Sequence, residues 1–248
     1  MHFKPLLALL LFLLVTPAAQ AAEARIAIAA NFTAVAKQIA QVFHQESGHT
    51  LRMSFGSTGK LYTQIIHGAP FDLFLAADSN RPERLEKEGK TVSKSRFTYA
   101  TGRLVLWGRD LKQPEAVLAY LKKGQFRKLA LANPKTAPYG AAALQTLSQL
   151  KLDKKLRAKM IRGDSIAQTF QFVATGNAQL GFVAASQVAR KHPGWRVPQS
   201  MHLPLSQQAV LLKRGANNPA AKAFLTFIKQ QKAQQIITSF GYGVESME

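Results

Sequence analysis

The chain has 248 residues and no cysteine, and its 33 lysines and arginines outnumber 13 aspartates and glutamates, for a formal net charge of +20. The missing cysteines exclude disulfides, thiolate metal sites and cysteine nucleophiles. The basic residues are spread along the chain without an RNA-binding aromatic pattern or a helix-turn-helix signal, so we expect a solvated basic surface and no nucleic-acid partner. A field that steers small anions towards a cleft is a second interpretation of the same charge.

The first 21 residues predict a secretory signal peptide. Lys4 precedes an uncharged apolar run over residues 6–15, and Ala19-Gln20-Ala21 supplies an A-x-A cleavage signal. The apolar run is shorter than the ~20 residues of a membrane-spanning helix. A chain without cysteine cannot carry a lipoprotein anchor, so we expect a free, monomeric periplasmic protein that begins at Ala22.

Three strand–turn–helix units are predicted in the first half of the chain. The strands are residues 25–30, 51–55 and 71–77, and the helices that follow them are residues 34–43, 61–66 and one beginning near Pro82. Three such units in succession imply a parallel sheet. Ligands of these sheets bind beyond the carboxyl ends of the strands, where the three turns would meet.

The second of these turns, Gly56-Ser57-Thr58-Gly59, is the most informative feature of the chain. A strand that enters a helix through two glycines and two hydroxyls leaves backbone N–H groups unpaired in front of the helix. The positive end of the helix dipole lies behind them. The turn therefore predicts a binding site for an oxyanion.

A second α/β pattern begins at Arg103. Its predicted strands are residues 104–107, 129–132 and 181–184, and its helices are residues 115–122, 141–150, 154–161 and 166–175. The last segment, a strand over 209–212 and helices over 219–230 and 233–240, is expected to return to the first sheet. The predicted fold is thus α/β with two lobes around a cleft, 22–102 plus 203–248 and 103–202, with hinges at 97–102 and 198–204.

Two features of the second lobe are candidates to face the same cleft. Tyr139 lies in a proline-stiffened loop at the start of a predicted helix, and it could equally be a packed, half-buried tyrosine. Asp164 or Ser165 is the expected N-cap of the helix that begins at Ile166. The first N–H groups of that helix would then be free to donate.

Spacing argues against an enzyme. Residues 54–61 depart from the phosphate-loop pattern at Ser54 and Leu61, and the chain contains no G-x-S-x-G sequence. The six histidines show no metal-ligand spacing. We therefore expect no catalytic residues, no cofactor and no direct protein–metal ligands.

Seven motifs spread over the mature chain form one family pattern: AANF at 29–32, FGSTG at 55–59, GAPFDLFLAAD at 68–78, SRFTYA at 95–100, the NP and APYG loop at 133–140, LGFVA at 180–184 and GYG at 241–243. Together they resemble the ModA-type molybdate-binding proteins of bacterial ABC importers. The resemblance implies a type II periplasmic binding protein that takes up molybdate or tungstate as the intact oxyanion and delivers it to a membrane permease. By motif position, its ligand contacts would be Asn31, Thr58, the Ala77 N–H, Tyr139 and the Ile166 N–H.

The chain departs from the family pattern at three positions. Asn31 and Thr58 stand where many members have serine, and Ala184 stands where many have a tyrosine. Other members take this tyrosine from the loop that carries Tyr139 here. The substitutions preserve the number of donors and leave the size of the pocket open, so sulfate or a small organic anion is the alternative ligand.

Overall fold

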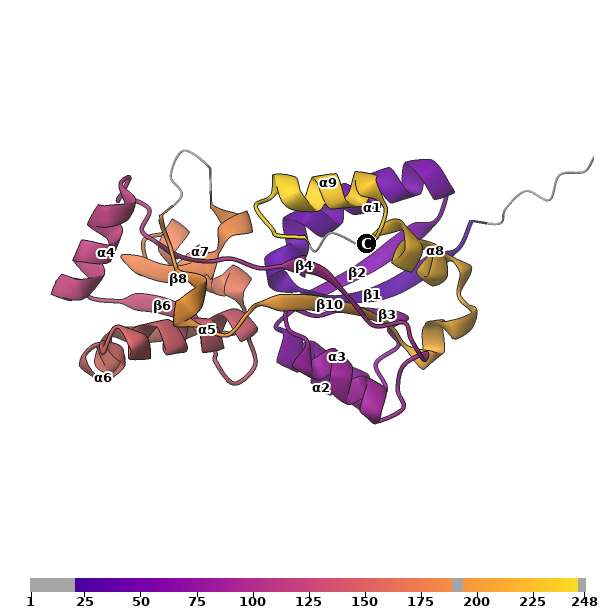
Figure 1. Ribbon diagram of the computed structural model, residues 1–248, viewed down its shortest axis with the longest axis horizontal. Coiled ribbons are helices and arrows are strands. Elements are labelled where there is room, and N and C mark those ends of the chain that lie inside the picture. The colour runs from indigo at the N-terminus through magenta and orange to yellow at the C-terminus, as the bar shows by residue number, and fades with distance from the viewer. Residues whose placement is uncertain (1–20, 189–193, 245–248) are drawn as a thin grey trace, which may run out of the picture.

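The computed structural model describes residues 21–188 and 194–244 and contains two lobes that lie side by side (Figure 1). The predicted signal peptide falls on residues outside this described part, apart from Ala21. Each lobe is built on one five-stranded sheet, in the orders β2-β1-β3-β10-β4 and β7-β6-β8-β5-β9. The α/β two-lobe fold predicted from the sequence is confirmed.

Lobe I, the part built on the first sheet, has parallel strands β2, β1 and β3 followed by antiparallel β10 and β4. One face packs against α1, α8 and α9 through Ile26 and Ile28, and the other against α2 and α3 through Ala27 (Figure 1). This alternation is the two-residue period of a strand buried on both faces. The elements are β1 Glu23–Ala29, α1 Thr33–Ser47, β2 Thr50–Gly56, α2 Thr58–Ile66, β3 Leu73–Leu75, α3 Asn80–Lys87, β4 Phe97–Thr101, β10 Ser206–Leu211, α8 Pro219–Phe227 and α9 Gln231–Ser239.

Lobe II follows the same plan, with parallel β7, β6 and β8 and then antiparallel β5 and β9. Leu104 and Leu106 face the core beneath α4 and α5, and Val105 faces the core that includes Val173 of α7. The elements are β5 Leu104–Trp107, α4 Pro114–Lys123, β6 Leu129–Ala132, α5 Pro138–Gln149, α6 Asp153–Leu156, β7 Met160–Gly163, α7 Ile166–Ala174, β8 Leu180–Ala184 and β9 Trp195–Arg196. Short 3-10 turns complete the two lobes: η1 Ala30–Phe32, η2 Arg157–Lys159, η3 Ala185–Gln187, η4 Gln199–Met201 and η5 Lys213–Asn217.

Three sequence predictions in lobe II are wrong in detail. The helix expected over 154–161 ends early, and β7 begins at Met160, because that segment pairs with β6. Helix α5 begins at Pro138, three residues before the predicted start, which places Tyr139 inside its first turn. The two-residue strand β9 was not predicted.

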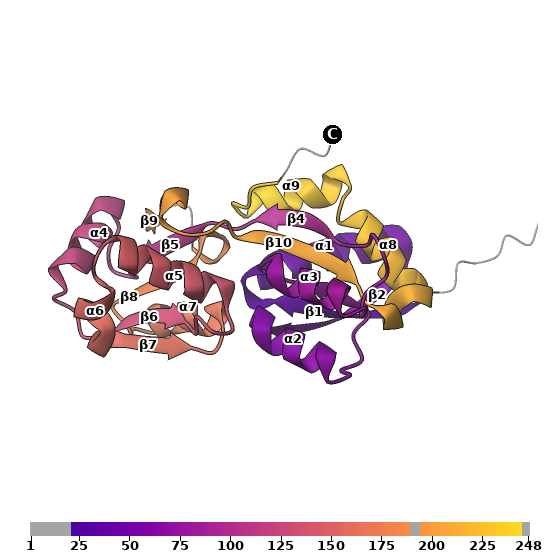
Figure 2. The same ribbon diagram turned by 60° about the horizontal axis from the view of Figure 1, so that its bottom comes forward.

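Two segments cross between the lobes (Figure 2). Most of the first predicted hinge, 97–102, is strand β4, so the first crossing is confined to Gly102 and Arg103 between β4 and β5. The second runs from β9 to β10 through η4. The predicted lobe boundaries, 22–102 plus 203–248 and 103–202, stay a prediction, and every strand of each sheet lies within its predicted range.

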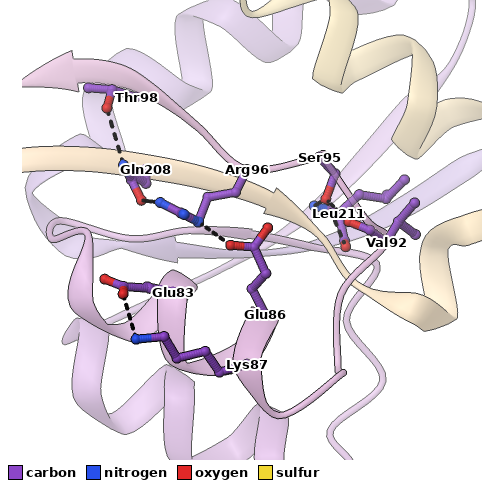
Figure 3. A network of polar contacts seen from close by, with 9 residues as sticks. All are labelled: Glu83, Glu86, Lys87, Val92, Ser95, Arg96, Thr98, Gln208 and Leu211. Carbon is purple, nitrogen blue, oxygen red and sulfur yellow. Dashed lines mark hydrogen bonds and ion pairs between the residues drawn. The ribbon is translucent and has the colours of Figure 1, made fainter.

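A register irregularity between Gln207 and Gln208 interrupts the pairing of β10 with β4 close to the second crossing. The Gln208 side chain accepts from Arg96 and donates to Thr98, and Arg96 also binds Glu86 of α3 (Figure 3). These bonds join α3, β4 and β10. Gln207 is fully buried, and its side chain belongs to the site described next.

Candidate functional site

The parallel strands of both sheets end at one cavity between the lobes. It is lined by Ala29, Ala30, Asn31, Gly56, Ser57, Thr58, Ala77, Ala137, Pro138, Tyr139 and Ile166. The lobe I residues follow β1, β2 and β3, and those of lobe II follow β6 and β7. All five sequence-predicted site residues are therefore brought together. Their role as ligand contacts stays a prediction.

The turn after β2 presents two buried hydroxyls. Thr58 Oγ1 accepts from the Ala77 N–H at 3.1 Å, so the proton of this hydroxyl is left for another acceptor. Ser57 is the N-cap of α2, yet its side chain makes no capping bond, and its buried Oγ has no partner among the described residues. A buried hydroxyl without a protein partner is free to bind a water molecule, an ion or a ligand. Ser57 was missed as a site residue, although the predicted oxyanion turn contained it.

The Asn31 side chain lies between the cavity and a buried polar network. Its Nδ2 donates to Gln207 Oε1 and to the Tyr242 hydroxyl, both at 2.9 Å. Its Oδ1 is buried without a partner among the described residues. In this arrangement the amide nitrogen is held by the protein. Presenting it to an anion requires the amide to turn over, which exchanges the nitrogen and the oxygen.

Gln207 is the centre of this network. Its Oε1 also accepts from the Tyr99 hydroxyl at 3.0 Å, and its Nε2 donates to the Tyr139 hydroxyl at 3.2 Å. The backbone carbonyl oxygen of Asn31 accepts from the Ser186 hydroxyl at 3.0 Å and from the Tyr242 hydroxyl at 2.8 Å. The network therefore couples cavity residues of both lobes. Neither Gln207 nor Tyr242 was predicted as a site residue: the return of the last segment to the first sheet was expected, but not which of its side chains would contact Asn31 and Tyr139.

Tyr139 is a buried part of the site, with only 1% of its surface exposed. Burial, followed by the nearby Tyr242 phenol, raises its pKa well above the usual value, and burial raises the pKa of Tyr242 to about 12. Both phenols are thus protonated at neutral pH and can donate. The Tyr139 hydroxyl packs against the backbone of Gly102 in the first crossing. A Cβ at position 102 would lie 2.2 Å from this hydroxyl, so only glycine fits there.

Ile166 is the first residue of α7, and its N–H has no acceptor within the helix. The Ser165 hydroxyl accepts from the Gln168 N–H at 3.3 Å, which confirms Ser165 as the predicted N-cap. Ser165 thus caps the first turn of α7 through Gln168, and Ile166 itself lines the cavity.

The two lobes touch each other around the cavity. The Gly59 N–H donates to the Thr136 carbonyl at 2.8 Å, and Lys60 pairs with Asp164 at 2.8 Å. Arg81, which is ion-paired with Asp78, donates to the Lys135 carbonyl at 3.1 Å. Each bond joins a lobe I group to a lobe II group. The cavity is therefore enclosed by contacts that exist only when the lobes are together.

The side chains that line the cavity are uncharged. No lysine or arginine is among the lining residues. The residues that the structure describes contain no group of three or more histidine, aspartate or glutamate side chains able to hold a metal ion. The lining offers the hydroxyls of Ser57, Thr58 and Tyr139 and the starts of α2, α5 and α7, which suit a small anion.

Two α/β lobes that enclose a donor-lined cavity at their strand ends define the class of extracytoplasmic solute-binding proteins. Across the described ranges, no helix is both long and apolar enough to cross a membrane. The model of the family described as bacterial extracellular solute-binding protein matches residues 24–243. The chain belongs to this family, and within it to the ModA group.

The similarity to individual proteins extends over nearly the whole chain. The molybdate-binding protein ModA of Azotobacter vinelandii is 52% identical over 233 residues, which cover 92% of each chain. ModA of Rhodobacter capsulatus is 48% identical over 234 residues, or 94% of this chain and 92% of that protein. The solved periplasmic molybdate-binding protein of A. vinelandii matches with a TM-score of 0.85 and 37% identity, and covers 90% of this chain and 100% of its own. These relatives confirm that the chain is a binding protein without a cofactor and not an enzyme.

Proposed function

We propose that this protein binds molybdate, and tungstate as its close chemical analogue, in the periplasm and delivers it to the permease of an ABC importer. The observation that carries the proposal is the meeting of neutral donors from both lobes at one enclosed cavity. The names of the relatives that are 52% and 48% identical supply the identity of the anion. Ser57, Thr58, Tyr139 and the Ile166 N–H are the donors available without rearrangement, and Asn31 joins them if its amide turns over.

Neutral donors suit a carrier that must release its cargo. A tetrahedral dianion leaves water only if each oxygen receives replacement hydrogen bonds, because an unpaired buried charge costs several kcal/mol. A lysine or arginine in the cavity would attract many anions and slow their release. Hydroxyls and helix N–H groups bind only at defined positions, so the spacing of the donors can select the anion.

Closure of the lobes follows from the same geometry. Thr58 and Ser57 belong to lobe I, whereas Tyr139 and Ile166 belong to lobe II. An anion that contacts both sets binds the closed form better than the open form, and it shifts the equilibrium by that difference in affinity. The closed form is then the one that a permease would recognise as loaded.

Titration calorimetry of the chain from Ala22 onwards with molybdate, tungstate, sulfate and phosphate tests the proposal. We expect molybdate and tungstate to bind at least about tenfold more tightly than sulfate, a difference of ~1.4 kcal/mol. Sulfate binding at equal or higher affinity, or binding of a small organic anion only, would replace the proposed ligand by the alternative. Mass spectrometry of the native protein should find Ala22 at its amino terminus, and size-exclusion chromatography should find a monomer.

A further inference from the structure

The two lobes differ in how many of their basic side chains form ion pairs. The described parts of lobe I and lobe II each contain fifteen lysines and arginines, with seven acidic residues in lobe I and four in lobe II. Eight of the fifteen basic side chains of lobe I form ion pairs. Among the described residues of lobe II, Arg109 alone does so. Among the described residues, most of the cations without an ion pair are therefore on lobe II.

These cations are concentrated at one end of lobe II. Residues 122–128 and 151–162 contain ten lysines and arginines and one acidic residue, Asp153. The two segments are in contact, because Lys155 donates to the Lys122 carbonyl at 3.5 Å and Lys159 to the Gly124 and Phe126 carbonyls at 2.6 and 2.9 Å. Six exposed side chains around this junction have no partner among the described residues, and we call them the amino-edge patch: Lys122, Lys123, Arg127, Lys128, Lys154 and Arg157.

The amino-edge patch lies on the side of lobe II that faces away from the cavity. Lys128 and Lys159 immediately precede Leu129 and Met160, which pair at the amino ends of β6 and β7. The cavity is at the carboxyl ends of the same strands. Figures 1 and 2 both place α4 and α6 at the end of lobe II farthest from lobe I.

The amino-edge patch is too far from the cavity to steer an oxyanion into it. Four-residue strands such as β6 and β7 put roughly 13 Å between their two ends. The Debye length at physiological ionic strength is about 8 Å. The patch is thus screened from the cavity, so it does not serve to steer the oxyanion into the site.

We propose that the amino-edge patch is a docking surface for the anionic phospholipid headgroups of a membrane. Clusters of four to eight lysines and arginines are attracted to anionic bilayers without any specific pocket. Four of the six side chains are lysines, a residue type that is depleted at protein–protein interfaces. None of the exposed large apolar side chains, Phe55, Leu144, Leu203 and Val244, lies in the patch, so it lacks the apolar centre of a protein interface and the aromatic platform of a single-strand nucleic-acid site.

Such docking is weak, reversible and sensitive to salt, and it does not depend on the oxyanion. It would concentrate an extracytoplasmic carrier at the surface in which a permease is embedded. Because the patch and the cavity share no residue, the membrane contact and the oxyanion site can be tested separately.

Vesicle flotation of the chain from Ala22 onwards tests the proposal. We expect binding to vesicles of phosphatidylglycerol mixed with phosphatidylcholine at about 0.15 M salt, and none to phosphatidylcholine alone or at about 1 M salt. The variant Lys122→Gln, Lys123→Gln, Arg127→Gln, Lys154→Gln should bind at least about tenfold more weakly. The matched control removes four exposed, unpaired lobe I lysines, Lys37, Lys90, Lys213 and Lys222, in the same way, and it should lose less than about threefold.

Equal losses in the two variants would show that net charge, and not the patch, drives the attraction, and would overturn the proposal. Absence of wild-type flotation with anionic vesicles, or equal flotation with neutral ones, would overturn it as well, as would binding of an acidic protein or nucleic acid in preference to the vesicles. The charge reversal Lys123→Glu alone should weaken flotation by about threefold or more. This single substitution tests the same surface if the fourfold variant is less stable than the wild type.

Discussion

Lobe I and lobe II share a sheet plan but present their donors differently. Lobe I supplies two hydroxyls at the start of α2, from its N-cap Ser57 and its first residue Thr58, directly after strand β2. Lobe II supplies Tyr139 and the Ile166 N–H from the first turns of α5 and α7. The Thr58 hydroxyl is held by a bond within lobe I, from the Ala77 N–H, whereas the Tyr139 hydroxyl is bonded to Gln207 of lobe I, across the lobe boundary.

This difference assigns separate tasks to the lobes. Lobe I holds the Thr58 hydroxyl in place without help from lobe II. On the proposed function, lobe I would make the first contact with the anion, and lobe II would complete the hydrogen bonds when the lobes meet. Variants that prevent this meeting should therefore cost more affinity than variants that remove one donor, and donors of the two lobes should differ in how they affect closure.

Gly59→Ala should have the largest effect. A Cβ at Gly59 would lie 2.9 Å from the Cα and the carbonyl oxygen of Thr136, which are backbone atoms of lobe II. The lobes would be held apart while every donor stays in place. We expect molybdate affinity to fall by about a hundredfold or more, roughly 2.7 kcal/mol, in titration calorimetry.

The matched control for this variant is Gly56→Ala in the same turn. A Cβ at Gly56 meets only the Leu61 side chain at 3.4 Å, within lobe I. Because Gly56 also lines the cavity, this control is read from compaction and not from affinity. Small-angle scattering should show ligand-induced compaction in Gly56→Ala and little in Gly59→Ala. Equal compaction in both would mean that the Gly59 contact does not limit closure.

Thr58→Ala tests the donors of lobe I. It leaves one oxyanion oxygen short of a charge-assisted hydrogen bond, worth roughly 1.5 to 3 kcal/mol, or about ten- to a hundredfold in affinity. It also removes the acceptor of the Ala77 N–H. Thr58→Ser keeps the hydroxyl and should be nearly silent. Wild-type affinity in the alanine variant would reduce Thr58 to a turn residue.

Tyr139→Phe tests the donor of lobe II. The ring stays, the hydroxyl is lost, and Gln207 Nε2 loses its acceptor. We expect about tenfold weaker binding, a faster off-rate and a smaller ligand-induced compaction, because this hydroxyl joins the lobes. Tyr120→Phe, at the outer end of lobe II, is the control and should behave as wild type. An unchanged off-rate in Tyr139→Phe would show that lobe II holds the anion through backbone groups alone.

The part of the site that follows from local sequence could be predicted. A strand, a polar turn and a helix start are encoded within about ten residues, so 56–59, Asn31 and Ala77 could each be placed at a strand's carboxyl end, and Ile166 at a helix start. Parallel packing then brings those ends together. This reasoning depends on no contact between distant segments.

The rest depends on distant segments. Gln207 and Tyr242 reach the site because β10 inserts beside β3 and β4 and the chain end returns to lobe I, and no local pattern encodes these pairings. The first two residues of strand β7 were included in a predicted helix, because a four-residue strand is too short for its side-chain period to identify it; its pairing with β6 does. Ser57 was overlooked for another reason. A serine before a helix is expected to cap it, and only the structure shows that its hydroxyl does not.

The smallest effect is expected from Lys60→Gln at the rim of the cavity. The Lys60–Asp164 ion pair joins the lobes, but its side chains are 49% and 72% exposed. Water and salt screen such a pair, which leaves roughly 0.2 to 1 kcal/mol. We expect an affinity loss below about fivefold at low salt and none at about 1 M salt, where the Debye length is about 3 Å. Asp164→Asn should give the same loss, and the double variant should lose no more than either single one. A larger loss that survives high salt would mean that this rim contact, and not only the donors inside the cavity, sets the balance between the open and closed lobes.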